Sequence, residues 1–320
     1  MTAALESVCP LDCPDTCSLT VEVDGGRLTK VDGSHRNPYT AGFICAKVRR
    51  YPERVHSPWR LLYPQRRVGA KGEGLFERIS WDEALAEIAE RFAAIIARHG
   101  AEAILPYHYG GSNGLFSEGG ADARFFHLLG ASELNKTICA APSGAAVRSL
   151  YGGMAGVPFE QYPRARLILL WGVNPSATSI HFEAILRRAR AAGALVAVID
   201  PRRTRVASQA DFHLAPRPGT DVALALAIAG ELIRQGGIDR DFIDAHVRGF
   251  DGFAEAAQAW PLERAAEVCD VPAAALAELA QRYAEATPAV IRCGWGVERN
   301  RNGANAVRAI LALPAIAGKF

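Results

Sequence analysis

Apolar runs of strand length alternate with stretches of helical spacing along the second half of this chain. The expected strands are residues 166–173, 194–199, 212–215 and 289–293. The expected helices are residues 179–191, 222–234 and 272–286, with one more beginning near Gly303. Short strands that alternate with helices are typical of a parallel sheet covered by helices on both faces. The pattern therefore predicts an α/β fold for this region.

One long helix is predicted in the first half of the chain. Ser80 is a favourable N-cap and Glu83 completes a capping box, so the helix is expected to begin at Trp81. Apolar residues then recur at helical spacing until Gly100, which is expected to end the helix. The apolar triplet 103–105 is expected to form the strand that follows.

Length and composition are those of an ordinary globular chain. Its 320 residues leave room for about two domains, and 49% of them are hydrophobic. The formal net charge of +2 gives no reason to expect nucleic acid or an anionic membrane as a partner. The sequence has no apolar run of transmembrane length, no signal-peptide pattern at the N-terminus and no twin-arginine pair there. We therefore expect a cytoplasmic protein without direct membrane insertion.

Four of the seven cysteines lie within the first 45 residues. Cys9, Cys13 and Cys17 are separated by three residues each, and Cys45 follows after 27 more. Residues 21–28 predict a β-hairpin around Asp-Gly-Gly, which would return Cys45 toward the other three. Three close thiolates and one returned thiolate suit a [4Fe–4S] cluster. The alternatives are disulfides and a four-cysteine zinc site, but zinc ligands usually come as two close pairs.

Polar residues follow the first two expected strands of the α/β region. Gly172 allows a close backbone approach, Asn174 can donate and accept hydrogen bonds, and Asp200 ends its strand as acidic residues do in dinucleotide sites. In residues 218–221, Asp221 either caps the next helix or binds the donors of a guanine. Ligands of open parallel sheets bind beyond the carboxyl ends of the strands, so we predict a nucleotide site at this edge. Each segment alone is equally typical of a turn or cap, and no G-x-G-x-x-G indicates a site for NAD.

Several short blocks stand in a fixed order along the chain. They are Cys45-Ala46-Lys47, Ser57-Pro58-Trp59-Arg60-Leu61, Ile79-Ser80-Trp81-Asp82-Glu83-Ala84-Leu85, Trp171-Gly172-Val173-Asn174-Pro175, Asp200-Pro201-Arg202-Arg203-Thr204 and Pro218-Gly219-Thr220-Asp221. Together with the cysteine group, they closely resemble the molybdopterin oxidoreductases of the dimethyl sulfoxide reductase family, over essentially the whole chain. The resemblance implies two cofactors, a [4Fe–4S] cluster and molybdenum or tungsten held by bis-molybdopterin guanine dinucleotide.

The resemblance also implies roles for individual residues. The four N-terminal cysteines would hold the cluster, and Lys47 would lie on an electron path between cluster and pterin. Cys139 would supply the protein ligand of the metal, and the loop at 110–113 would face the pterin. The residues that would bind one guanine-dinucleotide tail are Gly172, Asn174, Pro175, Asp200, Arg202, Thr204, Pro218, Gly219 and Asp221.

The fold that the resemblance implies is a small N-terminal iron–sulfur domain followed by doubly wound α/β domains, as in formate dehydrogenase and dimethyl sulfoxide reductase. Residues 1–60 would form the cluster domain, 61–135 the first half of a discontinuous α/β domain, and 136–320 a Rossmann-like domain. The family's C-terminal domains have no counterpart in these 320 residues, so the gene is expected to continue.

The implied activity is oxygen-atom transfer or dehydrogenation of a small-molecule substrate. Electrons would pass through the cluster to or from a ferredoxin-like or flavin subunit. Formate dehydrogenases usually carry a histidine next to the metal ligand, and Ala140 at that position counts against formate. Two alternatives are a metal-free iron–sulfur subunit of the kind found in respiratory complex I, and a hydratase or hydroxyl transferase with the same cofactor.

Overall fold

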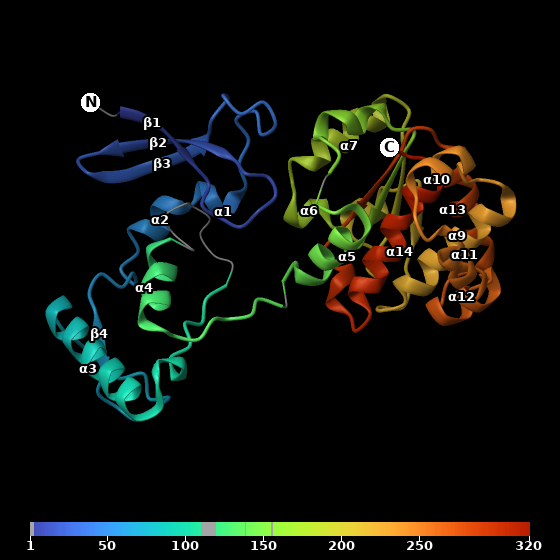
Figure 1. The fold of residues 1–320 in the computed structure, drawn as a ribbon. Helices are drawn as coiled ribbons and strands as arrows, with labels where there is room; N and C mark the ends of the chain where they lie inside the picture. Colours follow the sequence, from blue (N-terminus) through green and yellow to red (C-terminus); the bar gives the residue numbers. More distant parts are fainter. Residues whose placement is uncertain (1–2, 110–119, 138, 155) are drawn as a thin grey trace. The chain divides into compact units, whose positions relative to one another are not determined.

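The structure is a computed structural model, and it describes residues 3–109, 120–137, 139–154 and 156–320. The chain forms two compact units, Met1–Lys136 and Thr137–Phe320. Both can be followed along the colours of Figure 1, and each is described by itself. No helix in the described ranges has both the length and the apolarity needed to cross a membrane.

The first unit begins with a three-stranded antiparallel sheet. Its strands are β1 (Ala3–Val8), β2 (Ser18–Asp24) and β3 (Arg27–Gly33), in the order β1-β2-β3. Gly25 and Gly26 form the turn between β2 and β3 with positive φ angles, which confirms the predicted hairpin. Two short helices follow, α1 (Ala46–Arg49) and α2 (Tyr51–Val55).

The rest of the first unit is mostly helical. Its elements are β4 (Gln65–Arg67), β5 (Phe76–Arg78), α3 (Trp81–His99), η1 (Ala101–Ala103) and α4 (Ala121–Leu129). The predicted capping box is present: Ser80 Oγ accepts from the Glu83 N–H, and a Glu83 carboxylate oxygen accepts from the Ser80 N–H at 2.7 Å. The strand expected at 103–105 was wrong, because this segment ends the 3₁₀ turn η1 and pairs with no strand among the described residues.

Helix α3 buries none of its side chains. Its apolar residues recur at helical spacing, yet Trp81 is 64% exposed, Leu85 59% and Ile88 50%. An amphipathic helix normally turns such a stripe toward a core. The apolar side of α3 therefore has little to pack against within the first unit.

The second unit is built on a four-stranded parallel sheet in the order β8-β7-β6-β9. The strands are β6 (Leu167–Trp171), β7 (Leu195–Ile199), β8 (Phe212–Leu214) and β9 (Ala289–Cys293), so all four expected strands are present. The chain winds outward from β6 through β7 to β8 and then returns to place β9 on the other side of β6. The direction of winding therefore changes between β6 and β9, which is where open parallel sheets bind ligands.

Helices cover the sheet on both sides (Figure 1). They are α5 (Ala141–Tyr151), η2 (Phe159–Arg164), α6 (Pro175–Thr178), α7 (Phe182–Ala191), α8 (Arg205–Ser208), α9 (Asp221–Gln235), α10 (Arg240–His246), α11 (Phe250–Gln258), α12 (Leu262–Cys269), α13 (Ala273–Glu285), η3 (Val297–Arg299) and α14 (Gly303–Ile316). Leu167, Leu169 and Trp171 share a core with α5, α9 and α14. Ile168 and Leu170 are equally buried, and strand alternation directs them to the opposite face, where α7 lies. Burial on both faces explains why β6 is continuously apolar.

Candidate cofactor sites

Three of the four N-terminal cysteines, Cys9, Cys17 and Cys45, lie at one small core of the first unit. Cys9, Cys13 and Cys17 lie on the loop that joins β1 to β2, where the Cys9 N–H donates to the Cys17 carbonyl at 2.9 Å. Cys45 is the N-cap residue of α1, and Lys47 lies exposed in the same helix. The apolar residues packed with these cysteines include Leu19, Val31, Ile44 and Val48.

Two thiols of this loop have raised pKa values. Burial is the largest cause of the raised pKa values of Cys13 and Cys17, and it brings that of Cys17 to about 12. Negative charge on Asp15 and on the other three cysteines adds to the effect at Cys17. The backbone bond between Cys9 and Cys17 and the core shared by Cys9, Cys17 and Cys45 bring these three residues to one place in the first unit.

A zinc site and an iron–sulfur cluster differ in how they group their thiolates. A zinc site draws its thiolates to about 2.3 Å from one ion. In the part of the chain that the structure describes, no three Cys, His, Asp or Glu side chains are grouped tightly enough for one ion. The preference for a cluster over zinc rests on the cysteine spacing in the sequence, three close cysteines and one distant one.

The carboxyl ends of β6 and β9 meet through glycines. Gly172 has a φ of +61°, and a Cβ there would lie 2.6 Å from Cγ2 of Val297. A Cβ on Gly294 would lie 2.4 Å from the Gly172 carbonyl oxygen, and the Gly294 N–H donates to the Trp171 carbonyl at 2.8 Å. The sequence predicted a close backbone approach at Gly172, and the approaching group is the turn after β9.

Asp221 links the end of β6 to the beginning of α9. One of its carboxylate oxygens accepts a hydrogen bond from the indole Nε1 of Trp171 at 2.8 Å. Burial raises the pKa of Asp221, and the negative charge of Asp200 adds to the shift. Gly219 has a φ of +85° and Pro218 is exposed. The structure therefore brings the ends of β6 and β7 and the 218–221 loop to one edge.

Two other predicted tail-binding residues make local backbone contacts. A carboxylate oxygen of Asp200 accepts from the Arg202 N–H at 2.8 Å, which shapes the turn after β7, while the Arg202 side chain is exposed. Thr204 Oγ1 accepts from the Ala207 N–H at 3.2 Å and caps α8. The hydroxyl of Thr204 thus already has a structural role.

Cys139 lies two residues before α5 and is half-buried. The small residues Ala140, Ala141, Gly144 and Ala145 line a hollow beside it, together with Arg148 and Met154. A histidine at position 140 would fill part of this hollow. The loop at 110–113, which the sequence placed near the pterin, lies outside the described residues, as does Ile138.

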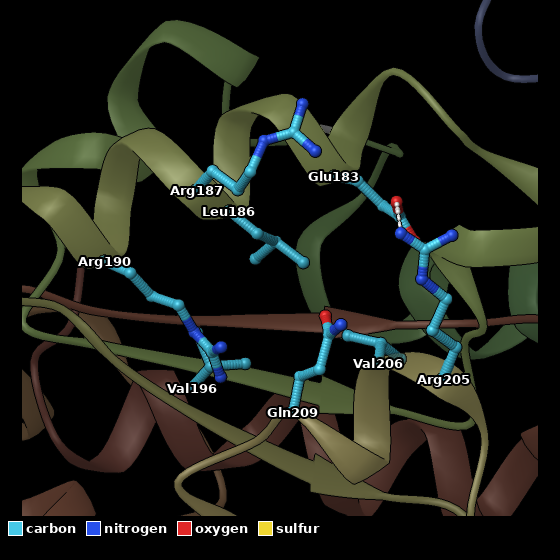
Figure 2. A pocket seen from close by; sticks show the side chains of 8 residues that line it. All are labelled: Glu183, Leu186, Arg187, Arg190, Val196, Arg205, Val206 and Gln209. Carbon is cyan, nitrogen blue, oxygen red and sulfur yellow. Dashed lines mark ion pairs between the residues drawn. The ribbon is translucent and has the colours of Figure 1, made fainter.

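A second hollow lies between α7 and α8 (Figure 2). Arg205 pairs with Glu183 at 3.6 Å on its wall, and Arg190 is 3.5 Å from Asp211. Val196, the second residue of β7, lies on its floor, so the hollow is beside the amino-terminal half of the strand. It is therefore separate from the carboxyl edge where the predicted binding residues meet.

Comparisons with known proteins identify the family. The family model described as "Molybdopterin oxidoreductase" matches residues 60–320 of the chain. A second model, described as "Molybdopterin oxidoreductase Fe4S4 domain", matches residues 2–57. The chain belongs to this family. Its cofactors are a [4Fe–4S] cluster and molybdenum bound by molybdopterin guanine dinucleotide.

Members of the family resemble the chain along nearly its whole length. "Probable oxidoreductase YoaE" of Bacillus subtilis is 38% identical over 315 residues, which cover 98% of this chain and 46% of that protein. "Dimethyl sulfoxide reductase DmsA" of Haemophilus influenzae is 31% identical, covering 98% and 43%. The structure of acetylene hydratase from Pelobacter acetylenicus matches with a TM-score of 0.84 and 31% identity, covering 98% and 43%. The chain thus spans about half the length of the curated relatives it matches.

The carboxyl edge of the parallel sheet has polar groups that fit a nucleotide ligand such as the family's cofactor. Asn174 Oδ1 and Ser176 Oγ are buried there without a hydrogen-bond partner among the described residues. Buried polar atoms normally have partners, so two orphaned oxygens at one edge indicate that a bound polar group completes them. Sequence reasoning missed Ser176 and the turn after β9. Asn174 was selected because it lies just beyond the carboxyl end of a strand. The same rule would have found Ser176 and the turn after β9.

Proposed function

We propose that the chain is the N-terminal part of a molybdenum- or tungsten-dependent oxidoreductase. The reaction is oxygen-atom transfer or dehydrogenation of a small molecule, with electrons relayed through the [4Fe–4S] cluster. The observation that carries the proposal is the family match across residues 60–320. Within that range, Cys139 lies two residues before α5, and we propose it as the protein ligand of the metal. A soft thiolate at this position suits molybdenum or tungsten.

The residues of this chain have distinct tasks in the proposal. Cys9, Cys13, Cys17 and Cys45 hold the cluster, and exposed Lys47 lies between cluster and pterin. The bound cofactor supplies the redox chemistry, whereas the protein binds, orients and insulates it. The residues proposed to bind one guanine-dinucleotide tail are Gly172, Asn174, Pro175, Asp200, Arg202, Thr204, Pro218, Gly219 and Asp221. For Thr204 this contact comes from its backbone, because the hydroxyl caps α8.

The domain organisation is part of the same proposal. Residues 1–60 form the cluster domain, 61–135 the first half of a discontinuous domain, and 136–320 the Rossmann-like domain. The exposed apolar stripe of α3 supports the second assignment, because half a domain leaves uncovered the surface that its other half would bury. The cytoplasmic location and a ferredoxin-like or flavin partner are further parts of the proposal.

Metal analysis and one substitution test the proposed function. The native full-length protein, purified without oxygen, should contain four irons, four sulfides and one molybdenum or tungsten. X-ray absorption at the metal edge should show one sulfur more than the pterins supply. Cys139→Ala should remove this sulfur and abolish turnover while leaving the cluster spectrum unchanged. Stoichiometric zinc without iron would contradict the cluster, and an unchanged metal spectrum in the variant would contradict the role of Cys139.

A non-redox hydratase is the second candidate, because the chain matches acetylene hydratase at a TM-score of 0.84. A hydratase adds water across an unsaturated bond and needs no net electron transfer. Small alkynes and alkenes should therefore be tested with and without an artificial electron acceptor. Turnover that is independent of the acceptor would favour the hydratase, and turnover that requires it would favour the oxidoreductase.

A further inference from the structure

Helix α5 begins two residues after Cys139 and lacks a local cap. Ala140 occupies the N-cap position, and no side chain there bonds to the first turn. The first N–H groups of a helix have no partners within the helix and need acceptors from elsewhere. For the Ser143 N–H this acceptor is Glu298, whose carboxylate oxygen Oε2 lies 2.8 Å away although the residue is 155 positions later.

Glu298 is held firmly where it meets α5. It lies in η3, and its side chain is fully buried, with 0% exposed. A Cβ on Gly303 would lie 2.4 Å from Cα of Glu298, so the start of α14 packs directly against the backbone of this residue. The neighbouring Val297 packs against Gly172 at the end of β6. One short segment therefore supports both the beginning of α5 and the predicted nucleotide edge.

The carboxylate has few other partners. Its second oxygen, Oε1, is buried without a hydrogen bond among the described residues, and it lies 3.9 Å from a guanidinium nitrogen of Arg299. Burying a charged group with so few partners is unfavourable. The positive end of the α5 dipole is a stabilising contact for this charge. An apolar side chain would fill the space more favourably, so packing alone does not explain a glutamate at this position.

We propose that Glu298 is a positioning residue for Cys139. Its bond to the Ser143 N–H fixes the first turn of α5, and within that turn the Gly144 N–H donates to the Ala140 carbonyl at 2.8 Å. Ala140 is bonded directly to Cys139, so the position of the thiol follows from the position of this turn. The importance of Glu298 for the metal rests on the proposed ligand role of Cys139, whereas its effect on the thiol itself does not.

Three variants separate hydrogen bonding from charge in the native full-length protein. Glu298→Ala removes the acceptor, Glu298→Asp keeps the charge but withdraws it by one methylene, and Glu298→Gln keeps an acceptor of the same length without the charge. Glu231→Ala is the matched control, because Glu231 is also buried in the second unit but bonds within α9 to Arg234 and Gln235.

Two measurements report on Cys139. In the metal-free protein, the rate at which iodoacetamide alkylates Cys139 is followed by peptide mass spectrometry. In the loaded protein, X-ray absorption gives the number of sulfurs at the metal. Loss of a bond to a charged group should loosen the turn, so we expect about tenfold faster alkylation in Glu298→Ala and Glu298→Asp. Both should also lose part of the protein sulfur at the metal, whereas Glu298→Gln and Glu231→Ala should match the wild type.

Several outcomes would overturn the inference. Equal alkylation rates in the wild type and Glu298→Ala would do so, and so would an equal increase in Glu231→Ala, because that increase reports general loosening. If Glu298→Ala does not fold, equal rates in Glu298→Asp and Glu298→Gln decide against the positioning role. An unchanged metal–sulfur count in Cys139→Ala would instead refute the proposed ligand, and the alkylation rates would still test the effect of Glu298 on α5.

Discussion

The carboxylate of Asp221 accepts a hydrogen bond from Trp171 within the protein, and it is also proposed to bind guanine. Asp221→Asn can keep the oxygen that accepts from Trp171 while replacing the other acceptor by a donor. We expect this variant to lose none of the thermal stability of the cofactor-free protein and to lose much of its guanine dinucleotide, because a hydrogen bond to a charged group contributes about 1.5–3 kcal/mol. Asp221→Ala should lower both, since it leaves a buried indole N–H unsatisfied. Thermal unfolding and the nucleotide released by acid measure the two effects, and full nucleotide content in Asp221→Asn would leave Asp221 a structural link.

The raised pKa of Asp221 predicts a pH dependence of stability in the cofactor-free protein. Burial disfavours the carboxylate, so the folded protein holds this proton more tightly than the unfolded chain, whose carboxyl titrates near 3.8. The contribution to the free energy of unfolding is therefore complete below pH 3.8 and is lost as pH rises through the higher folded value. Asp221→Asn cannot titrate. Its stability relative to the wild type should rise with pH over this window in urea unfolding, and a constant difference would contradict the assignment.

Two glycines at the edge differ in how much space surrounds them. Gly172→Ala introduces a positive-φ alanine and places its Cβ 2.6 Å from Val297. Backbone strain and overpacking together should cost about 2–5 kcal/mol of stability. Gly219→Ala is the control, because its φ is also positive but its nearest neighbours lie at 3.5 Å. It should cost only the strain, about 1–2 kcal/mol. Urea unfolding midpoints compare the two variants. Equal losses of stability would show that Val297 moves aside to accommodate the new Cβ.

At the scale of elements, α3 depends more on its own sequence than the helices of the second unit do. It buries no side chain, whereas eight residues of α9 are buried. Ser80→Ala removes one half of the capping box and should destabilise α3 by about 1 kcal/mol, while Ser80→Asp keeps an acceptor. Hydrogen exchange should therefore accelerate in the amides of α3 and remain unchanged in α9. Acceleration in both helices would mean that the two units unfold together.

Some elements could be predicted from the sequence because buried strands consist mostly of apolar residues. β6 to β9 are apolar runs, and all five residues of β6 are buried. β1 left no such pattern, since its described side chains from Ala4 to Val8 are exposed and its pairing with β2 is made by the backbone. The beginning of α5 was hidden for another reason. Pro142, Ser143 and Gly144 are weak helix formers, and the acceptor for that turn comes from a distant residue, which local pattern cannot reveal.

The sequence predicted candidate site residues within the short segments that resemble the family. It did not predict contacts made by residues outside those segments. Gly172 and Asp200 follow the carboxyl ends of the neighbouring strands β6 and β7, and Asp221 bonds to Trp171 at the end of β6. The bond between Trp171 and Asp221 was not foreseen, because it joins a strand to a helix 50 residues later. The contact between Glu298 and α5 is of the same kind. Both depend on the sheet order, with β9 beside β6, which sequence alternation alone does not determine.

At the scale of the whole molecule, the first unit exposes apolar side chains, and the relatives of the chain are about twice its length. These two facts predict how residues 1–320 behave when expressed alone. Trp59, Leu61 and Leu62 are each more than 60% exposed, in addition to the stripe of α3. Residues 1–320 expressed alone should therefore bind a hydrophobic dye and tend to aggregate. They should also carry iron but little molybdenum, because one bound tail holds the metal less tightly than two. Dye fluorescence, light scattering and metal analysis test this, and a monodisperse protein with full molybdenum would contradict it.

The hydrogen bond between Trp171 and Asp221 also gives the molecule an optical reporter. Trp171 is 0% exposed, whereas Trp59, Trp81 and Trp295 are 89%, 64% and 48% exposed. A water-soluble quencher should suppress emission from those three and leave that of Trp171, at short wavelength, together with part of the emission of half-buried Trp260. Part of the residual fluorescence then comes from an indole bonded to the carboxylate proposed to bind guanine. Loading of the cofactor edge could be followed in real time through this signal, without any label.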